Sequence, residues 1–206
     1  MLISAISSKF PTLAAQLDIP LEDTVELFLG PMFESGDHPW HRCERGELAV
    51  ADLQPLVAAI ASERGLTLRG DEMEFLFRPM YEYHQNVLDR IRKLRADGIA
   101  TALLTNSVRE YRPILESELD FDEFFDVVVD SSEVGMRKPE PRIFEFTAAA
   151  LGVPHEAVIY LDDFAGNIAG AERMGWTTIH VSDPTAALTE LDRKLALAVG
   201  DTEEDS

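Results

Sequence analysis

A regular alternation of short apolar segments and helical stretches after Gly98 is the feature that most constrains the fold of this chain. The apolar segments cover residues 99–104, 127–129, 157–161 and 177–181. Prolines and glycines punctuate the helices between them, since Pro139 and Pro141 open one helix that ends at Gly152 and Gly175 ends the next. This order predicts an α/β, Rossmann-like core with a mostly parallel sheet, whose ligands bind beyond the carboxyl ends of the strands.

The chain before Gly98 has a helical pattern and few signs of strands. Apolar residues recur there at the spacing of one helix face, at Leu53, Leu56, Val57 and Ile60 and again at Val87, Leu88, Ile91 and Leu94. Prolines and glycines divide this part into about five short helices. We therefore expect a helical subdomain over residues 7–80, an α/β core over residues 81–200 and a frayed acidic tail over residues 201–206.

The charge of the chain limits its partners. Lys and Arg number 18 and Asp and Glu 38, which leaves a formal net charge of −20. A surface this negative repels nucleic-acid backbones and anionic lipids, so we expect neither nucleic acid nor a membrane as a partner. No apolar run approaches the roughly 20 residues of a membrane helix, and residues 1–10 do not have the pattern of a signal peptide. The single Cys43 cannot form an internal disulfide, and together these features predict a cytoplasmic protein.

Polar residues follow the first predicted strand of the core. Thr105, Asn106 and Ser107 supply hydroxyl and amide groups beside backbone N–H groups that open the next helix. Such a turn suits a small anion, but it equally suits the capping of a helix. The residues alone leave both interpretations open.

A lysine and two aspartates follow the next two strands. Lys138 precedes a proline, which favours an extended backbone from which the ammonium group can reach the end of the sheet, although a surface lysine is the commoner case. Asp162 and Asp163 end an apolar strand, where carboxylates need a cation or a donor, and Mg²⁺ meets that need. Helix capping is the alternative role, and Asn167 lies one turn further on, where it can orient either carboxylate. Polar residues at three successive strand ends together indicate a metal-assisted phosphate site.

A second group of metal-ligating side chains lies in the helical part. His38, His41 and Cys43 are close in the sequence, but a structural zinc site needs four ligands. A turn that opens a short helix is therefore the favoured interpretation. Trp40 and Arg42 lie among these residues and are weaker candidates for contact with a substrate.

Three segments of the core resemble motifs of the haloacid dehalogenase superfamily. They are LLTNS (103–107), VGMRKPEPRIF (134–144) and YLDDFAGN (160–167). Their order and spacing are similar to the second, third and fourth motifs of that superfamily, and the likeness covers about residues 37–195. Within it, the chain most resembles the phosphatase-like domain at the amino end of soluble epoxide hydrolase. The resemblance implies that the helical subdomain is a cap.

The same resemblance implies roles for the residues at the strand ends. Thr105, Asn106 and Lys138 would bind the transferring phosphoryl group. Lys138 would also act in catalysis by offsetting charge between nucleophile and substrate. Asp162 and Asp163 would hold Mg²⁺, with Asn167 in support. In the superfamily an aspartate attacks the substrate, and water then hydrolyses the aspartyl intermediate.

The first motif of the superfamily has no counterpart in this chain. That motif is an apolar strand ending in the nucleophilic aspartate, whereas residues 1–10 contain no acid and the first acid, Asp18, lies in a helical stretch. The missing strand would lie between the strands that end at Thr105 and Asp162. We therefore expect a gap there with unpaired backbone groups, each costing roughly 1 to 3 kcal/mol. The expected cause is a start placed too late or a truncation, and the less favoured alternative inserts residues 1–6 into the gap.

Two hypotheses for the function follow. In the first, the protein is a Mg²⁺-dependent hydrolase, of the phosphatase type, that acts on a small phosphorylated or halogenated metabolite and whose nucleophile strand is missing from the sequence. In the second, it is a non-catalytic binding or scaffold protein that retains the phosphate and metal pocket.

Overall fold

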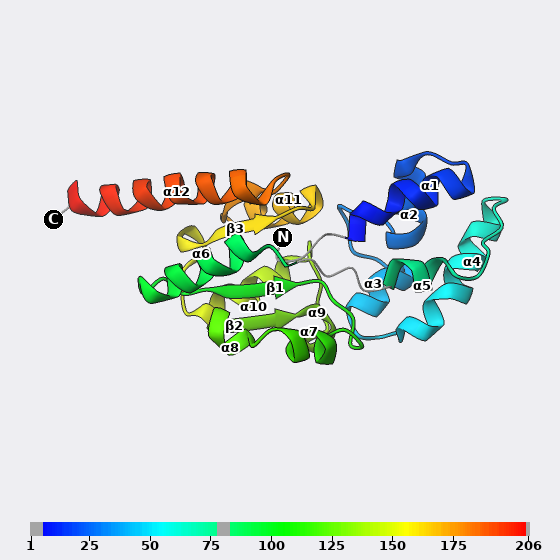
Figure 1. Ribbon diagram of the computed structural model, residues 1–206, viewed down its shortest axis with the longest axis horizontal. Helices are drawn as coiled ribbons and strands as arrows, with labels where there is room; N and C mark the ends of the chain where they lie inside the picture. Colours follow the sequence, from blue (N-terminus) through cyan, green and yellow to red (C-terminus); the bar gives the residue numbers. More distant parts are fainter. Residues whose placement is uncertain (1–5, 78–82, 205–206) are drawn as a thin grey trace.

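The computed structural model describes residues 6–77 and 83–204, which form two parts side by side (Figure 1). The described residues of the first part, hereafter the helical part, form helices and connecting loops. These helices are η1 (Ile6–Lys9), α1 (Phe10–Leu17), α2 (Leu21–Leu29), α3 (Pro39–Glu44), η2 (Val50–Asp52), α4 (Leu53–Glu63) and α5 (Glu72–Phe77). The boundary expected near residue 80 lies outside the described residues. No described helix combines the length and the apolar character needed to cross a membrane.

The helices of the helical part pack around one apolar core. The predicted apolar face lies on α4, where Leu53 and Val57 are completely buried. Leu56, which belongs to the same predicted pattern, lies at the edge of the core and is 37% exposed. Leu27 and Phe28 of α2 belong to the same apolar core as α4 and are also completely buried.

The second part, hereafter the α/β part, alternates strands and helices in the predicted order. Its elements are α6 (Gln85–Ala96), β1 (Ala102–Thr105), α7 (Arg112–Glu118), α8 (Phe121–Phe124), β2 (Val127–Asp130), α9 (Ser131–Val134), α10 (Pro141–Leu151), η3 (His155–Ala157), β3 (Ile159–Asp162), α11 (Ala165–Arg173), β4 (Thr177–His180) and α12 (Pro184–Glu204). The helix α12 continues into the expected acidic tail as far as Glu204, and residues 205–206 lie outside the described residues.

The strands form two separate parallel pairs. β1 pairs with β2, with Thr105 opposite Asp130, and β3 pairs with β4, with Asp162 opposite His180. Among the described residues no strand joins β1 to β3. Residues 1–5 lie outside the described residues, and Ile6 begins the 3₁₀ turn η1 of the helical part.

Helices cover both faces of each strand pair. Side chains such as Leu104 and Tyr160 pack against α10 and α11, whereas their neighbours Leu103 and Leu161 point to the opposite face, which α6, α8 and α12 cover. This double coverage explains why the strands are apolar at nearly every position. The carboxyl ends of the strands face the helical part (Figure 1).

Candidate functional site

The six residues predicted at the strand ends line one cavity. The cavity has a volume of about 620 Å³ and is lined by all four residues of β1 and all four of β3. The predicted residues in its lining are Thr105, Asn106, Lys138, Asp162, Asp163 and Asn167. The fold therefore brings together side chains from three separate segments of the sequence, while their roles in binding stay predictions.

Lys138 connects the carboxyl ends of β1 and β3. Its Nζ donates a hydrogen bond to the carbonyl oxygen of Leu104 at 2.9 Å and pairs with Oδ2 of Asp162 at 2.7 Å. The same Nζ lies 5.6 Å from the centre of the Tyr160 ring. A buried ammonium group needs an anion and further acceptors to offset its desolvation. Lys138 is thus both a bridge between the two strand pairs and a fixed positive charge beside the cavity.

The carboxylate of Asp162 is held by donors from β3 and α11. Its Oδ1 accepts hydrogen bonds from Phe164 N at 2.7 Å and Asn167 Nδ2 at 3.1 Å. Its Oδ2 accepts from the Tyr160 hydroxyl as well as from Lys138. Burial opposes the ionisation of Asp162, but the charge of Lys138 and these hydrogen bonds outweigh it and hold the pKa below its ordinary value. The site therefore contains an ionised carboxylate in a fixed orientation. Asn167, predicted to orient an aspartate, donates directly to Asp162.

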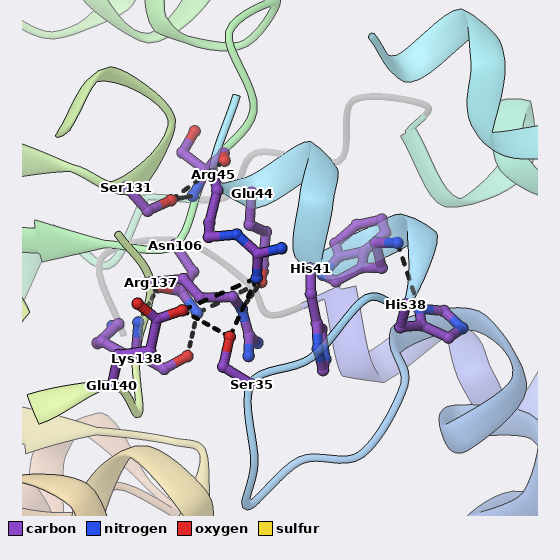
Figure 2. Close-up of polar contacts among 12 residues, drawn as sticks. Ser35, His38, His41, Glu44, Arg45, Asn106, Ser131, Arg137, Lys138 and Glu140 are labelled. Atoms are coloured by element: carbon purple, nitrogen blue, oxygen red, sulfur yellow. Dashed lines mark hydrogen bonds and ion pairs between the residues drawn. The ribbon is translucent and has the colours of Figure 1, made fainter. Parts of the chain in front are cut away.

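Asn106 holds the backbone of Lys138 (Figure 2). Its Oδ1 accepts from Lys138 N at 2.8 Å, and its Nδ2 donates to the Lys138 carbonyl oxygen at 3.0 Å. This double contact fixes the Lys138 loop against the end of β1. The N–H of Ser107 donates to Ser131 Oγ at 2.9 Å, so it is not one of the free N–H groups expected for an anion cradle. Thr105 lies half-buried at the last position of β1 and lines the cavity.

The chemistry of the donors fits part of a Mg²⁺ site. Asp162 and Asp163 supply hard carboxylate oxygens at one edge of the cavity. In residues 6–77 and 83–204 no three acidic, histidine or cysteine side chains gather closely enough to hold a metal ion. Two carboxylates are nevertheless enough for Mg²⁺, which usually completes its coordination with waters and substrate phosphates.

The histidines of the helical part open a helix, as the favoured interpretation predicted. His38 is the N-cap of α3, and its Nδ1 accepts a hydrogen bond from Trp40 N at 3.2 Å. His38, His41 and Cys43 belong to no metal-binding group among the described residues. Trp40 lines the cavity, whereas Arg42 is not among the lining residues.

Charged residues that the sequence did not single out also line the cavity, and two of them, Glu44 and Arg137, pair with each other. Arg137 Nε donates to Oε2 of Glu44 at 2.6 Å, and less than a tenth of either side chain is exposed. Glu44 ends α3 in the helical part, and Arg137 precedes Lys138 in the α/β part (Figure 2). Burial raises the pKa of Glu44, although the adjacent Arg137 opposes this shift. Arg137 lies in the segment VGMRKPEPRIF (134–144), in which the sequence indicated no role for it. No sequence pattern distinguished Glu44.

Comparison with known proteins identifies sequence relatives of this chain. A family model described as haloacid dehalogenase-like hydrolase matches residues 44–175. The bifunctional epoxide hydrolase 2 of Rattus norvegicus is 36% identical over 104 residues, which are 48% of this chain and 19% of that protein. The glyceraldehyde 3-phosphate phosphatase of Pyrococcus furiosus is 34% identical over 90 residues, 42% of this chain and 37% of that protein. The matches therefore span well under half the length of these two relatives.

A solved structure shares the fold. The HAD family enzyme bt-2542 from Bacteroides thetaiotaomicron, in complex with magnesium and inorganic phosphate, has a TM-score of 0.60 and 18% sequence identity to this chain. The alignment covers 90% of this chain and 92% of that chain, so both parts of the molecule have a counterpart there.

Proposed function

Because this chain belongs to the haloacid dehalogenase-like hydrolase family, we propose that it is a Mg²⁺-dependent phosphatase that acts on a small phosphorylated metabolite. One observation carries the proposal: Thr105 at the end of β1, Asp162 at the end of β3 and Lys138 after β2 line the same cavity. The matched phosphatase relative favours a phosphate ester over a halogenated substrate. In this proposal the helical part is the cap over the cavity.

The proposal gives each residue of the site a role. Thr105 and Asn106 position the phosphoryl group at the end of β1. Lys138 offsets negative charge near the reacting atoms, because its ammonium group is held there by Leu104 and Asp162. Mg²⁺, when bound by Asp162 and Asp163, neutralises further charge on the phosphate. Asn167 and the Tyr160 hydroxyl keep the Asp162 carboxylate in one orientation.

The proposed nucleophile belongs to a strand that is not among the described residues. β1 and β3 both line the cavity, and no described strand pairs with their remaining edges. An apolar strand in this slot would pair with both edges and carry its last residue toward Thr105, Lys138 and Asp162. An aspartate there would attack phosphorus and form an aspartyl phosphate, the alcohol would leave with a proton, and water would then release inorganic phosphate. In the proposal this strand precedes Met1 in a longer polypeptide.

Phosphate release tests this function. The assay uses small phosphomonoesters, with and without Mg²⁺, and compares the 206-residue chain with a chain extended at its amino end by the residues encoded upstream. We predict turnover only for the extended chain with Mg²⁺. Asp162→Asn in that chain should lower the rate on the order of 100-fold or more, since it removes a charge next to the reacting atoms.

The matched control for this substitution is Asp97→Asn. Asp97 also pairs with a lysine, Lys93, at 3.1 Å, but about half of its side chain is exposed and it is not among the residues that line the cavity. This control should retain full activity. Equal activity of Asp162→Asn and the unsubstituted chain would contradict the assignment.

A non-catalytic binding protein is the second candidate function. It is favoured by the hydrogen bonds from Phe164, Asn167 and Tyr160 that already saturate the Asp162 carboxylate, and by the lack of a described strand bearing a nucleophile. In that case calorimetry would detect binding of inorganic phosphate, and neither the extended chain nor the 206-residue chain would turn over.

A further inference from the structure

We propose that Glu44 is an internal anion that masks Arg137, and that an anionic group of the ligand displaces it on entering the cavity. Arg137 is then an additional anion-binding group of the site, and Glu44 couples ligand entry to movement of the helical part. This inference rests on the proposed function, because it takes that anionic group to be a phosphate.

Two hydrogen bonds engage the guanidinium group of Arg137, which leaves further N–H donors for a ligand. Its Nε donates to Glu44 at 2.6 Å, and Nη1 makes a contact of 3.4 Å with the Glu34 carbonyl oxygen. A guanidinium group has five N–H donors and binds phosphate through two parallel hydrogen bonds. Glu44 engages it through one oxygen, so a phosphate group would make the stronger contact. Oε2 of Glu44 also lies 3.5 Å from Asn106 Nδ2, which places the carboxylate among the proposed phosphate-binding groups (Figure 2).

The second buried cation of the cavity is paired differently. Lys138 is paired with Asp162, which lies in the same part of the molecule and receives further hydrogen bonds from the start of α11. Glu44 lies instead on α3 of the helical part, so rotation of its side chain or movement of the helical part separates it from Arg137 without unfolding the sheet. Burial also disfavours the charged form of Glu44 and raises its pKa, which indicates that Arg137 compensates it incompletely.

A built-in fluorophore reports on Glu44. Trp40 lies on the same short helix α3 as Glu44 and lines the same cavity, and its ring stacks on Phe77 with centroids 5.5 Å apart. The chain has two tryptophans, and the other, Trp176, donates to His155 Nδ1 at 2.8 Å within the α/β part. The substitution Trp176→Phe therefore leaves Trp40, on the same helix as Glu44, as the single tryptophan.

The test measures binding of inorganic phosphate, in the presence of Mg²⁺, to the extended chain. Glu44→Gln keeps the shape of the side chain and removes its charge, so calorimetry should find phosphate affinity raised about tenfold. Adding Arg137→Gln should abolish the gain. Glu47→Gln is the matched control, because Glu47 lies on the same segment and pairs with Arg45 at 2.7 Å, and it should leave the affinity unchanged.

Fluorescence provides a second measurement that does not require Glu44→Gln to fold. In Trp176→Phe, which retains Glu44, phosphate should change the emission of Trp40. Phosphate binding by calorimetry without any change in Trp40 emission would overturn the proposal. An affinity of Glu44→Gln equal to or below that of the unsubstituted chain would also overturn it and would leave the proposed function intact. Lack of phosphate binding by every variant would contradict both.

Discussion

His41 on α3 is a completely buried titratable side chain among positive charges. Burial, followed by the charges of Arg137, His38 and Arg45, lowers the pKa of His41 to about 3. Its Nδ1 accepts a hydrogen bond from Gly36 N at 3.1 Å, which requires an unprotonated nitrogen. The folded protein therefore keeps His41 neutral at pH values where the unfolded chain protonates it.

We predict that this residue makes the free energy of unfolding fall as the pH decreases from 6.5 toward about 3. The unfolded state binds a proton in this range that the folded state excludes, so the loss is at most about 1.4 kcal/mol per pH unit, and the contribution is constant above the range. Urea denaturation across this range should show a shallower slope for His41→Gln than for the unsubstituted protein. His180→Gln, which removes an exposed histidine, should keep the original slope. Identical slopes for His41→Gln and the unsubstituted protein would refute the prediction.

At the same scale, the sequence indicated which residues follow the strands but not what their side chains contact. Lys138 and Asp162 were recognisable because charged groups after apolar strands need partners, and they pair with each other. The contacts of Asn106 with the Lys138 backbone depend on the fold of a loop and have no sequence pattern. Glu44 and Arg137 lie 93 positions apart, so only the packing of the two parts brings them together.

At the scale of elements, the type and order of the core elements were predictable, but their first residues were not. The predicted strand 99–104 is β1 (Ala102–Thr105) in the structure, because Ile99 N bonds to the Leu94 carbonyl oxygen in the turn that follows α6. The helix end predicted at Gly152 is confirmed. Gly152 is the C-cap of α10 and has a φ of 69°, which residues with a side chain disfavour.

The contact between α11 and the helical part depends on the absence of a side chain at Gly166. A Cβ atom there would lie 2.1 Å from the carbonyl oxygen of Met32. We predict that Gly166→Ala forces the two parts apart and lowers the free energy of unfolding by about 1 to 3 kcal/mol, despite the better helix propensity of alanine.

Denaturant unfolding checks this prediction, with Gly36→Ala as the control. A Cβ atom at Gly36 would meet nothing within 4 Å, so this substitution should leave the stability nearly unchanged. If the two variants were equally stable, the close approach of Gly166 to Met32 would not matter for the packing of the two parts.

At the scale of the whole molecule, the sequence predicted that no described strand joins β1 to β3, but not where the helical part lies. The prediction follows from motif order, because the strand between β1 and β3 has no candidate in the sequence. The position of the helical part depends on contacts between residues far apart in the sequence. Ser35 Oγ, for example, donates to Glu140 Oε1 at 2.5 Å across 105 positions.

The open edges of β1 and β3 lead to a prediction for hydrogen exchange. In the 206-residue chain, amides of β1 and β3 that point toward the cavity should exchange faster than those bonded to β2 and β4, because an unpaired amide lacks protection. The extended chain should protect them. Equal protection in the two chains would contradict this prediction.

The separation into two strand pairs has a consequence in time as well as in space. Each pair joins strands that are neighbours in the sequence, β1 with β2 and β3 with β4, so each closes a short stretch of chain. We expect these pairs to form as two early, independent folding units. Under the proposed function, the nucleophile strand would enter between them last, so an incompletely folded chain would have no catalytic activity.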